Sequence, residues 1–120
     1  MSEFPPEIQQ LAADLALAGN QEVTVVAYLK SRPGKEEETH QLLLSLVAPT
    51  LEEDGCIDYL LHRSNDDPCI FLYYENWRSK EDLDEHLAMP HLTTLFEKKD
   101  DLLAEPIDVK LFTMTSQRPA

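Results

Sequence analysis

The chain has 120 residues, of which 42% are hydrophobic, and this fits one globular domain. Its formal net charge of -13 would repel phosphate backbones and anionic lipid surfaces at long range, so we expect neither nucleic acid nor a membrane as a partner. No apolar run reaches the roughly 18 residues that cross a bilayer, and the first residues lack the basic and apolar regions of a secretory signal. We therefore expect a cytoplasmic protein.

The two cysteines, Cys56 and Cys69, lie at the edges of predicted strands. Their spacing matches neither a zinc motif nor a redox motif, so we expect reduced thiols. Residues that commonly bind metals do not recur at short spacings elsewhere in the sequence. The sequence therefore predicts no metal.

The N-terminal segment, residues 1–21, is predicted to be a helical extension. Apolar residues recur at helical spacing over Pro5–Ala18, and Gly19 with Asn20 closes that helix. We expect it to pack on the surface of the main domain or on a partner subunit.

The main domain is predicted over residues 22–116, followed by a tail at 117–120. Hydrophobic periodicity and turn residues predict its elements in chain order. These are a strand over Glu22–Lys30, a helix over Lys35–Val47 that Pro49 ends or kinks, strands over Cys56–Arg63 and Cys69–Asn76, helices that start after Ser79 and at Pro90, and a strand over Ile107–Met114. The order β-α-β-β-α-β predicts an α+β, ferredoxin-like fold, with helices on one face of an antiparallel four-stranded sheet.

Both faces of the predicted sheet are apolar. On the third strand Phe71 and Tyr73 alternate with Ile70, Leu72 and Tyr74. Helices cover only one face in this fold, and an apolar face of several hundred Å² is rarely left in water. The sequence therefore predicts a homodimer that packs sheet against sheet. The alternative is that the N-terminal helix covers this face within one chain.

A set of residues in fixed order resembles a known family. The pattern is E-x-G…Y…P-x-x-F-x-x-x-E-x-W…H-x-x-x-P-H, carried by Glu53, Gly55, Tyr59, Pro68, Phe71, Glu75, Trp77, His86, Pro90 and His91. It is similar to the antibiotic biosynthesis monooxygenase domain, especially its small quinol-monooxygenase-like members, over about Glu22 to Thr115. The resemblance implies a dimeric α/β barrel with a pocket between sheet and helices in each subunit. Members of the family oxidise electron-rich aromatics with O₂, often without metal or flavin, while others degrade haem or modify small signalling molecules.

Such chemistry makes specific demands on a pocket. Triplet O₂ reacts slowly with closed-shell molecules, but the anion of a quinol or phenol can pass it one electron. The protein must then supply a base active near neutral pH, a dry pocket and flat apolar walls. No cofactor is needed, because the substrate is the reductant.

His86 and His91 are the candidate bases, since histidine titrates near neutral pH. His86 shares the apolar side of its helix with Leu83 and Leu87, so it should point toward the sheet. Each histidine has a structural alternative: His86 as a core residue bonded to a carbonyl, and His91 as a helix cap. Trp77 is a third catalytic candidate that could stack on a planar substrate, or could instead plug the core.

Asn76, Tyr59 and Phe71 are the candidate substrate-binding residues. For Glu75 we expect a salt bridge across the dimer, because a buried carboxylate needs a partner. Glu53 is expected to remain solvated.

Other functions remain open. The haem-degrading branch of the family uses an asparagine on its first strand, where this chain has Ala27 and Tyr28. The alternatives to a monooxygenase are a non-catalytic small-molecule-binding module and an isomerase or detoxifying enzyme for a small metabolite. Fold alone does not choose among them.

Overall fold

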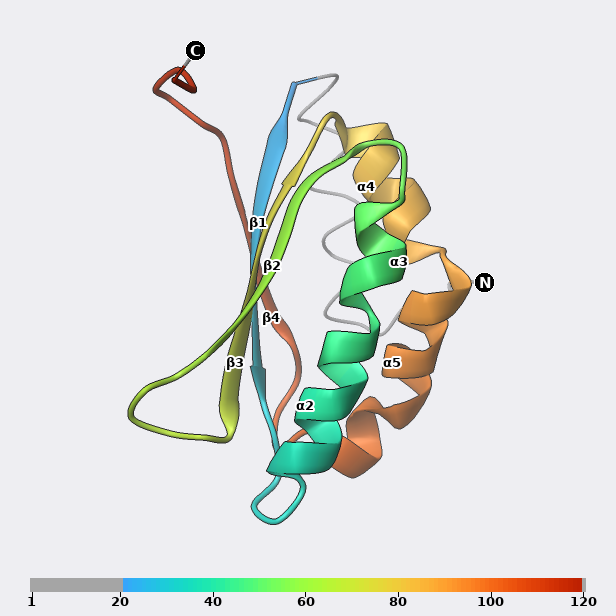
Figure 1. The fold of residues 1–120 in the computed structure, drawn as a ribbon, viewed down its shortest axis with the longest axis vertical. Helices are drawn as coiled ribbons and strands as arrows, with labels where there is room; N and C mark the ends of the chain where they lie inside the picture. The colour runs from blue at the N-terminus through green and yellow to red at the C-terminus, as the bar shows by residue number, and fades with distance from the viewer. Residues whose placement is uncertain (1–20, 120) are drawn as a thin grey trace.

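The computed structural model describes residues 21–119, so the helix predicted over Pro5–Ala18 lies outside the described residues. The elements in order are β1 (Val23–Lys30), α2 (Glu36–Ser45), α3 (Val47–Leu51), β2 (Cys56–Arg63), β3 (Ile70–Trp77), α4 (Lys80–Leu87), α5 (Pro90–Leu102) and β4 (Asp108–Phe112). Figure 1 shows the four labelled helices stacked on one face of a single sheet. Among residues 21–119, no helix is long and apolar enough to cross a membrane.

The sheet has the strand order β2-β3-β1-β4, and every neighbouring pair is antiparallel. β1 therefore lies beside β3 and β4, and each helical crossover returns the chain to the sheet from the same side (Figure 1). This is the predicted α+β, ferredoxin-like arrangement. A register shift between Cys56 and Asp58 marks an irregularity at the start of β2.

The predicted helix bounds needed one correction. The segment after β1 forms two helices, α2 and α3, which are separated at Leu46. Pro49 interrupts the helix as predicted, because it lacks the N–H that would bond the carbonyl of Ser45, where α2 ends; it lies inside the first turn of α3, where proline is accommodated. The last strand is also shorter than predicted, with five residues over Asp108–Phe112.

The starts of α4 and α5 follow the sequence signals. The hydroxyl of Ser79 accepts a hydrogen bond from the backbone N–H of Asp82, so Ser79 is the N-cap of α4. Pro90 is the first residue of α5, where its fixed φ suits a helix start. These two starts set the direction of the helices that carry His86 and His91.

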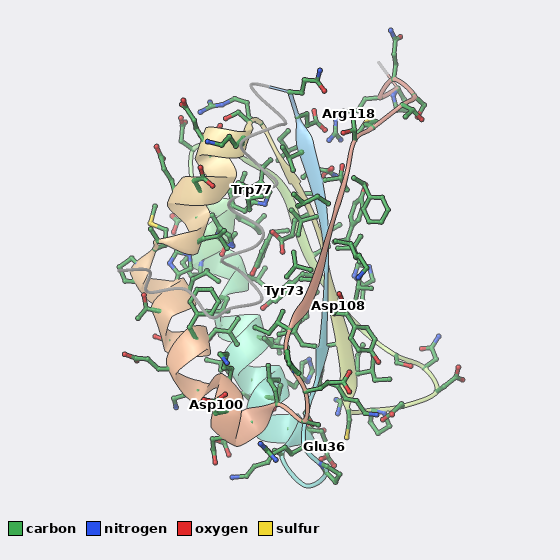
Figure 2. All side chains as sticks on the ribbon, turned by 180° about the vertical axis from the view of Figure 1, so that it is seen from behind. Glu36, Tyr73, Trp77, Asp100, Asp108 and Arg118 are labelled. Atoms are coloured by element: carbon green, nitrogen blue, oxygen red, sulfur yellow. The ribbon has the colours of Figure 1, made fainter. Side chains whose placement is uncertain are left out.

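The described helices cover one face of the sheet and leave the other face uncovered (Figure 1). The inner face packs under the helices and includes Val25, Phe71, Tyr73 and Trp77, and Figure 2 shows Tyr73 and Trp77 between sheet and helices. The outer face carries the alternate residues of each strand, in cross-strand rows such as Leu60, Tyr74 and Val26. The strand alternation predicted from sequence is confirmed, and no described helix covers the outer face.

Candidate functional site

One carboxylate connects two histidines beneath the helices. Oε2 of Glu53 lies 2.8 Å from Nδ1 of His86 and 2.9 Å from Nε2 of His91. The side chains of Glu53 and His86 are 6% and 2% exposed, while that of His91 is 19% exposed. Glu53 lies between α3 and β2, His86 in the last turn of α4, and His91 in the first turn of α5. The expectation that Glu53 remains solvated is therefore wrong.

The contact fixes how His86 can act. A neutral imidazole has one N–H and one lone pair, and the partner of one nitrogen sets the role of the other. Because a carboxylate accepts hydrogen bonds, Nδ1 of His86 donates to Glu53. Nε2 then carries the lone pair and can accept a proton.

Aromatic side chains surround the His86 ring. The ring centroid of Trp77 lies 4.4 Å from that of His86, and the centroid of Tyr59 lies 5.3 Å from it. Tyr59 in turn stacks on Tyr73 at 4.4 Å. Burial raises the pKa of both tyrosines, so their hydroxyls stay protonated. The Tyr73 hydroxyl donates to the carbonyl of Leu43 at 2.6 Å.

Glu75 is a second buried carboxyl group on the same face. It is 5% exposed and accepts a 2.9 Å hydrogen bond from the indole Nε1 of Trp77. Burial raises the pKa of Glu75, although nearby His86 and the Trp77 bond lower it in part. The predicted salt bridge across a sheet-to-sheet dimer is wrong, because Glu75 faces the helices rather than the outer face.

A cavity of about 40 Å³ lies between sheet and helices. Its polar lining consists of Tyr59, Tyr73, Glu75 and His86, and the remaining lining is aliphatic apart from Phe96. O₂ fits this space, whereas an aromatic ring requires its apolar walls to move apart.

The structure brings together some of the predicted site residues and separates others. His86 and Tyr59 line the cavity. Trp77 and His91 contact His86 or its carboxylate partner without lining the cavity themselves. Asn76 lies on the opposite side of the sheet, where its amide donates to Asp58 at 2.9 Å. Phe71 is fully buried beneath His40, with ring centroids 5.4 Å apart.

Sequence reasoning missed the roles of Glu53 and Glu75. The signal for Glu75 was its parity, because residues two apart on a strand share a face, and Glu75 alternates with the side chains of Tyr73 and Trp77 that are buried under the helices. The signal for Glu53 was weaker, since it precedes β2 in a turn and its contacts come from two helices far along the chain.

Comparison with known proteins identifies the family. The model of the family described as antibiotic biosynthesis monooxygenase matches residues 22–98. The chain belongs to this family. Among curated relatives of this monooxygenase-family chain, the uncharacterized Synechocystis protein sll1783 is 33% identical over 90 residues, which are 75% of this chain and 61% of that protein. The chain thus matches less than two thirds of that relative.

Two further relatives carry provisional monooxygenase names. Rv0793 of Mycobacterium tuberculosis is 33% identical over 98 residues, covering 82% of this chain and 96% of the relative. YcnE of Bacillus subtilis is 29% identical over 87 residues, which cover 72% of this chain and 92% of the relative. The solved structure of Rv0793 matches this family member with a TM-score of 0.78 at 30% identity, over 82% of this chain and all of the other. The solved structure of the Pseudomonas aeruginosa protein PA3566 matches with a TM-score of 0.77 at 27% identity, over 80% of this chain and 96% of the other.

Proposed function

We propose that this protein is a cofactor-independent monooxygenase that oxidises a small, electron-rich phenol or quinol with O₂. The observation that carries the proposal is the His86 ring, which lines an apolar cavity while its Nδ1 is held by the buried carboxylate of Glu53. This arrangement supplies a positioned base in a site with little water. Membership of the monooxygenase family supports the same reaction class.

The reaction would begin with a proton transfer. Nε2 of His86 takes the proton of the substrate hydroxyl, and Glu53 stabilises the imidazolium through Nδ1. The substrate anion then passes one electron to O₂, and the resulting radical pair combines to form a carbon–oxygen bond. When the hydroperoxide breaks its O–O bond, one oxygen remains as a ring carbonyl and the other leaves as water. The carbon that is oxidised loses its hydrogen, so atoms and electrons balance without an external reductant.

The other residues of the site would bind and orient. The apolar walls of the cavity would accept a ring, whereas the Tyr73 hydroxyl already donates to the carbonyl of Leu43. Trp77 packs behind His86 and limits rotation of its ring. Because the cavity is small, we expect a monocyclic substrate to enter more readily than a bicyclic one.

Oxygen uptake tests the proposal. Purified protein is mixed with a reduced benzoquinol or naphthoquinol in an oxygen electrode, and uptake above the spontaneous rate is expected. His86→Gln should lower this rate by about 10²-fold to 10⁴-fold, the usual contribution of a general base. His40→Gln is the matched control, because His40 stacks on Phe71 away from the cavity. Absence of uptake with both quinols, or equal rates in wild type and His86→Gln, contradicts the proposal.

The same samples distinguish the alternatives. A binding module would show thermal stabilisation by the quinol without turnover. An isomerase or detoxifying enzyme would form product under argon, whereas the proposed oxygenase requires O₂.

We also propose that the working form is a homodimer that packs through the outer face of the sheet. Exposed apolar side chains gather there, with Leu60 48%, Tyr74 37% and Phe112 53% exposed. Leu60 and Tyr74 are direct cross-strand neighbours, so they form a continuous patch. A second copy would remove this patch from water.

A further inference from the structure

We propose that Glu53, His86 and His91 form a binding site for one divalent transition-metal ion, and that the bound ion switches off the His86 base. The binding site is independent of the function proposed above. Only the consequence for the base rests on that function.

The donor set matches a known class of metal ligands. Two imidazole nitrogens and one carboxylate oxygen are typical ligands of Zn²⁺, Fe²⁺, Co²⁺ and Ni²⁺. The three donor atoms lie within 4.8 Å of one another. They come from the turn before β2, from α4 and from α5, so folding brings together ligands that are distant in sequence.

The distances fit a shared ion. Nδ1 of His86 and Nε2 of His91 lie 2.8 and 2.9 Å from the same oxygen of Glu53. Donor atoms bound about 2.1 Å from one ion, at a right angle to each other, are roughly 3 Å apart. An ion could therefore replace the two hydrogen-bonding protons with small side-chain movements, and water would complete its coordination.

The local charge favours a cation. The carboxylate of Glu53 is buried, with the rings of His86 and His91 as its hydrogen-bond partners. Buried carboxylates are costly unless a partner offsets their charge. A divalent cation beside Glu53 would offset it more fully than the two neutral imidazoles do. The partial exposure of His91 gives the ion a route from solvent.

Occupancy would reverse the role of His86. A metal ion binds the lone pair of a ring nitrogen, so coordination through Nδ1 moves the single imidazole proton to Nε2. Nε2 would then donate a hydrogen bond into the cavity and could no longer accept a proton. The ion would thus inhibit the proposed oxygenation rather than assist it.

Metal titration of untagged protein tests the site. Calorimetry with Zn²⁺ and visible absorption with Co²⁺ should both give one ion per chain. Glu53→Gln and His91→Gln should each weaken binding by more than the roughly 10-fold to 100-fold that outer-shell changes cost. His91 is the most exposed of the three ligands, so His91→Gln should disturb folding least. It therefore still tests the site if Glu53→Gln does not fold. His40→Gln is the matched control and should bind as wild type does.

Nitrogen-15 NMR of the histidine rings tests the switch without relying on turnover. Zn²⁺ should move the His86 proton from Nδ1 to Nε2, and a chelator should move it back. Absence of stoichiometric binding, or binding that survives in both ligand variants, overturns the site. An unchanged His86 tautomer in the Zn²⁺-bound protein overturns the switch. Failure of the proposed oxygenase is seen separately, as absent oxygen uptake in metal-free protein.

Discussion

Gly55 lies against the carboxyl group of Asp82 so closely that a Cβ at Gly55 would come within 2.1 Å of Asp82 Cγ. Asp82 is held in place by the Ser79 hydroxyl at 2.8 Å and by the guanidinium of Arg78. The backbone N–H of Arg78 also donates to the Gly55 carbonyl at 2.9 Å. The turn that carries Glu53 is therefore fixed against the start of α4, the helix that carries His86.

Gly55→Ala should destabilise the fold and disturb the site together. The added methyl group must displace either the turn or the first turn of α4, at a cost of about 1–3 kcal/mol, which chemical denaturation measures. Because Glu53 lies two residues before Gly55, oxygen uptake should fall in the folded variant. A change in unfolding free energy below about 0.5 kcal/mol would show that turn and helix separate freely.

Much of the fold could be predicted from the sequence because its local signals agree with one another. Alternation divided the residues of β3 between the two faces of the sheet, and Ser79 and Pro90 marked two helix starts. The break at Leu46 follows from Pro49, which cannot bond the carbonyl of Ser45, but the short helix α3 after the break was not predicted.

The candidate site was predictable only in part. The position of His86 followed from helical periodicity. Its contact with Glu53 joins residues 33 apart in the chain, and no local pattern reports such a contact. Asn76 is fully buried like its neighbours on β3, but strand parity turns it away from the cavity.

Glu75 should make stability depend on pH. Because burial raises the pKa of Glu75 above its ordinary value of 4.5, the folded state holds this proton more tightly than the unfolded state. The resulting stability is full below the unfolded pKa and is lost as pH rises through the folded pKa. Glu75→Gln removes this loss, so its unfolding free energy relative to wild type should increase as pH rises above 4.5.

The control for Glu75 is Glu81→Gln, since Glu81 is exposed in the first turn of α4. Its stability relative to wild type should not follow the same trend. Parallel pH profiles for Glu75→Gln and wild type would mean that Glu75 is as well solvated in the folded state as in the unfolded one.

Cys56 should resist alkylation in the folded protein. Burial, together with the charges of Glu53, Glu75 and Asp58, raises the pKa of the Cys56 thiol to about 12. The thiolate is the reactive form, so little of it exists near neutral pH. In a Cys69→Ser variant, iodoacetamide should label Cys56 at least about a hundredfold more slowly in the folded state than in denaturant, as mass spectrometry would measure. Equal rates would show that the start of β2 opens readily to solvent.

The outer face of the sheet should control assembly. Leu60→Lys places a charge within the proposed interface, where burying it without a partner is costly. Sedimentation should therefore show a dimer for wild type and a monomer for the variant. Leu51→Lys is the matched control, because Leu51 is 50% exposed, similar to the 48% of Leu60, but lies on α3 away from the sheet face. The proposed interface is wrong if Leu51→Lys alone dissociates the dimer, or if the wild-type chain sediments as a monomer.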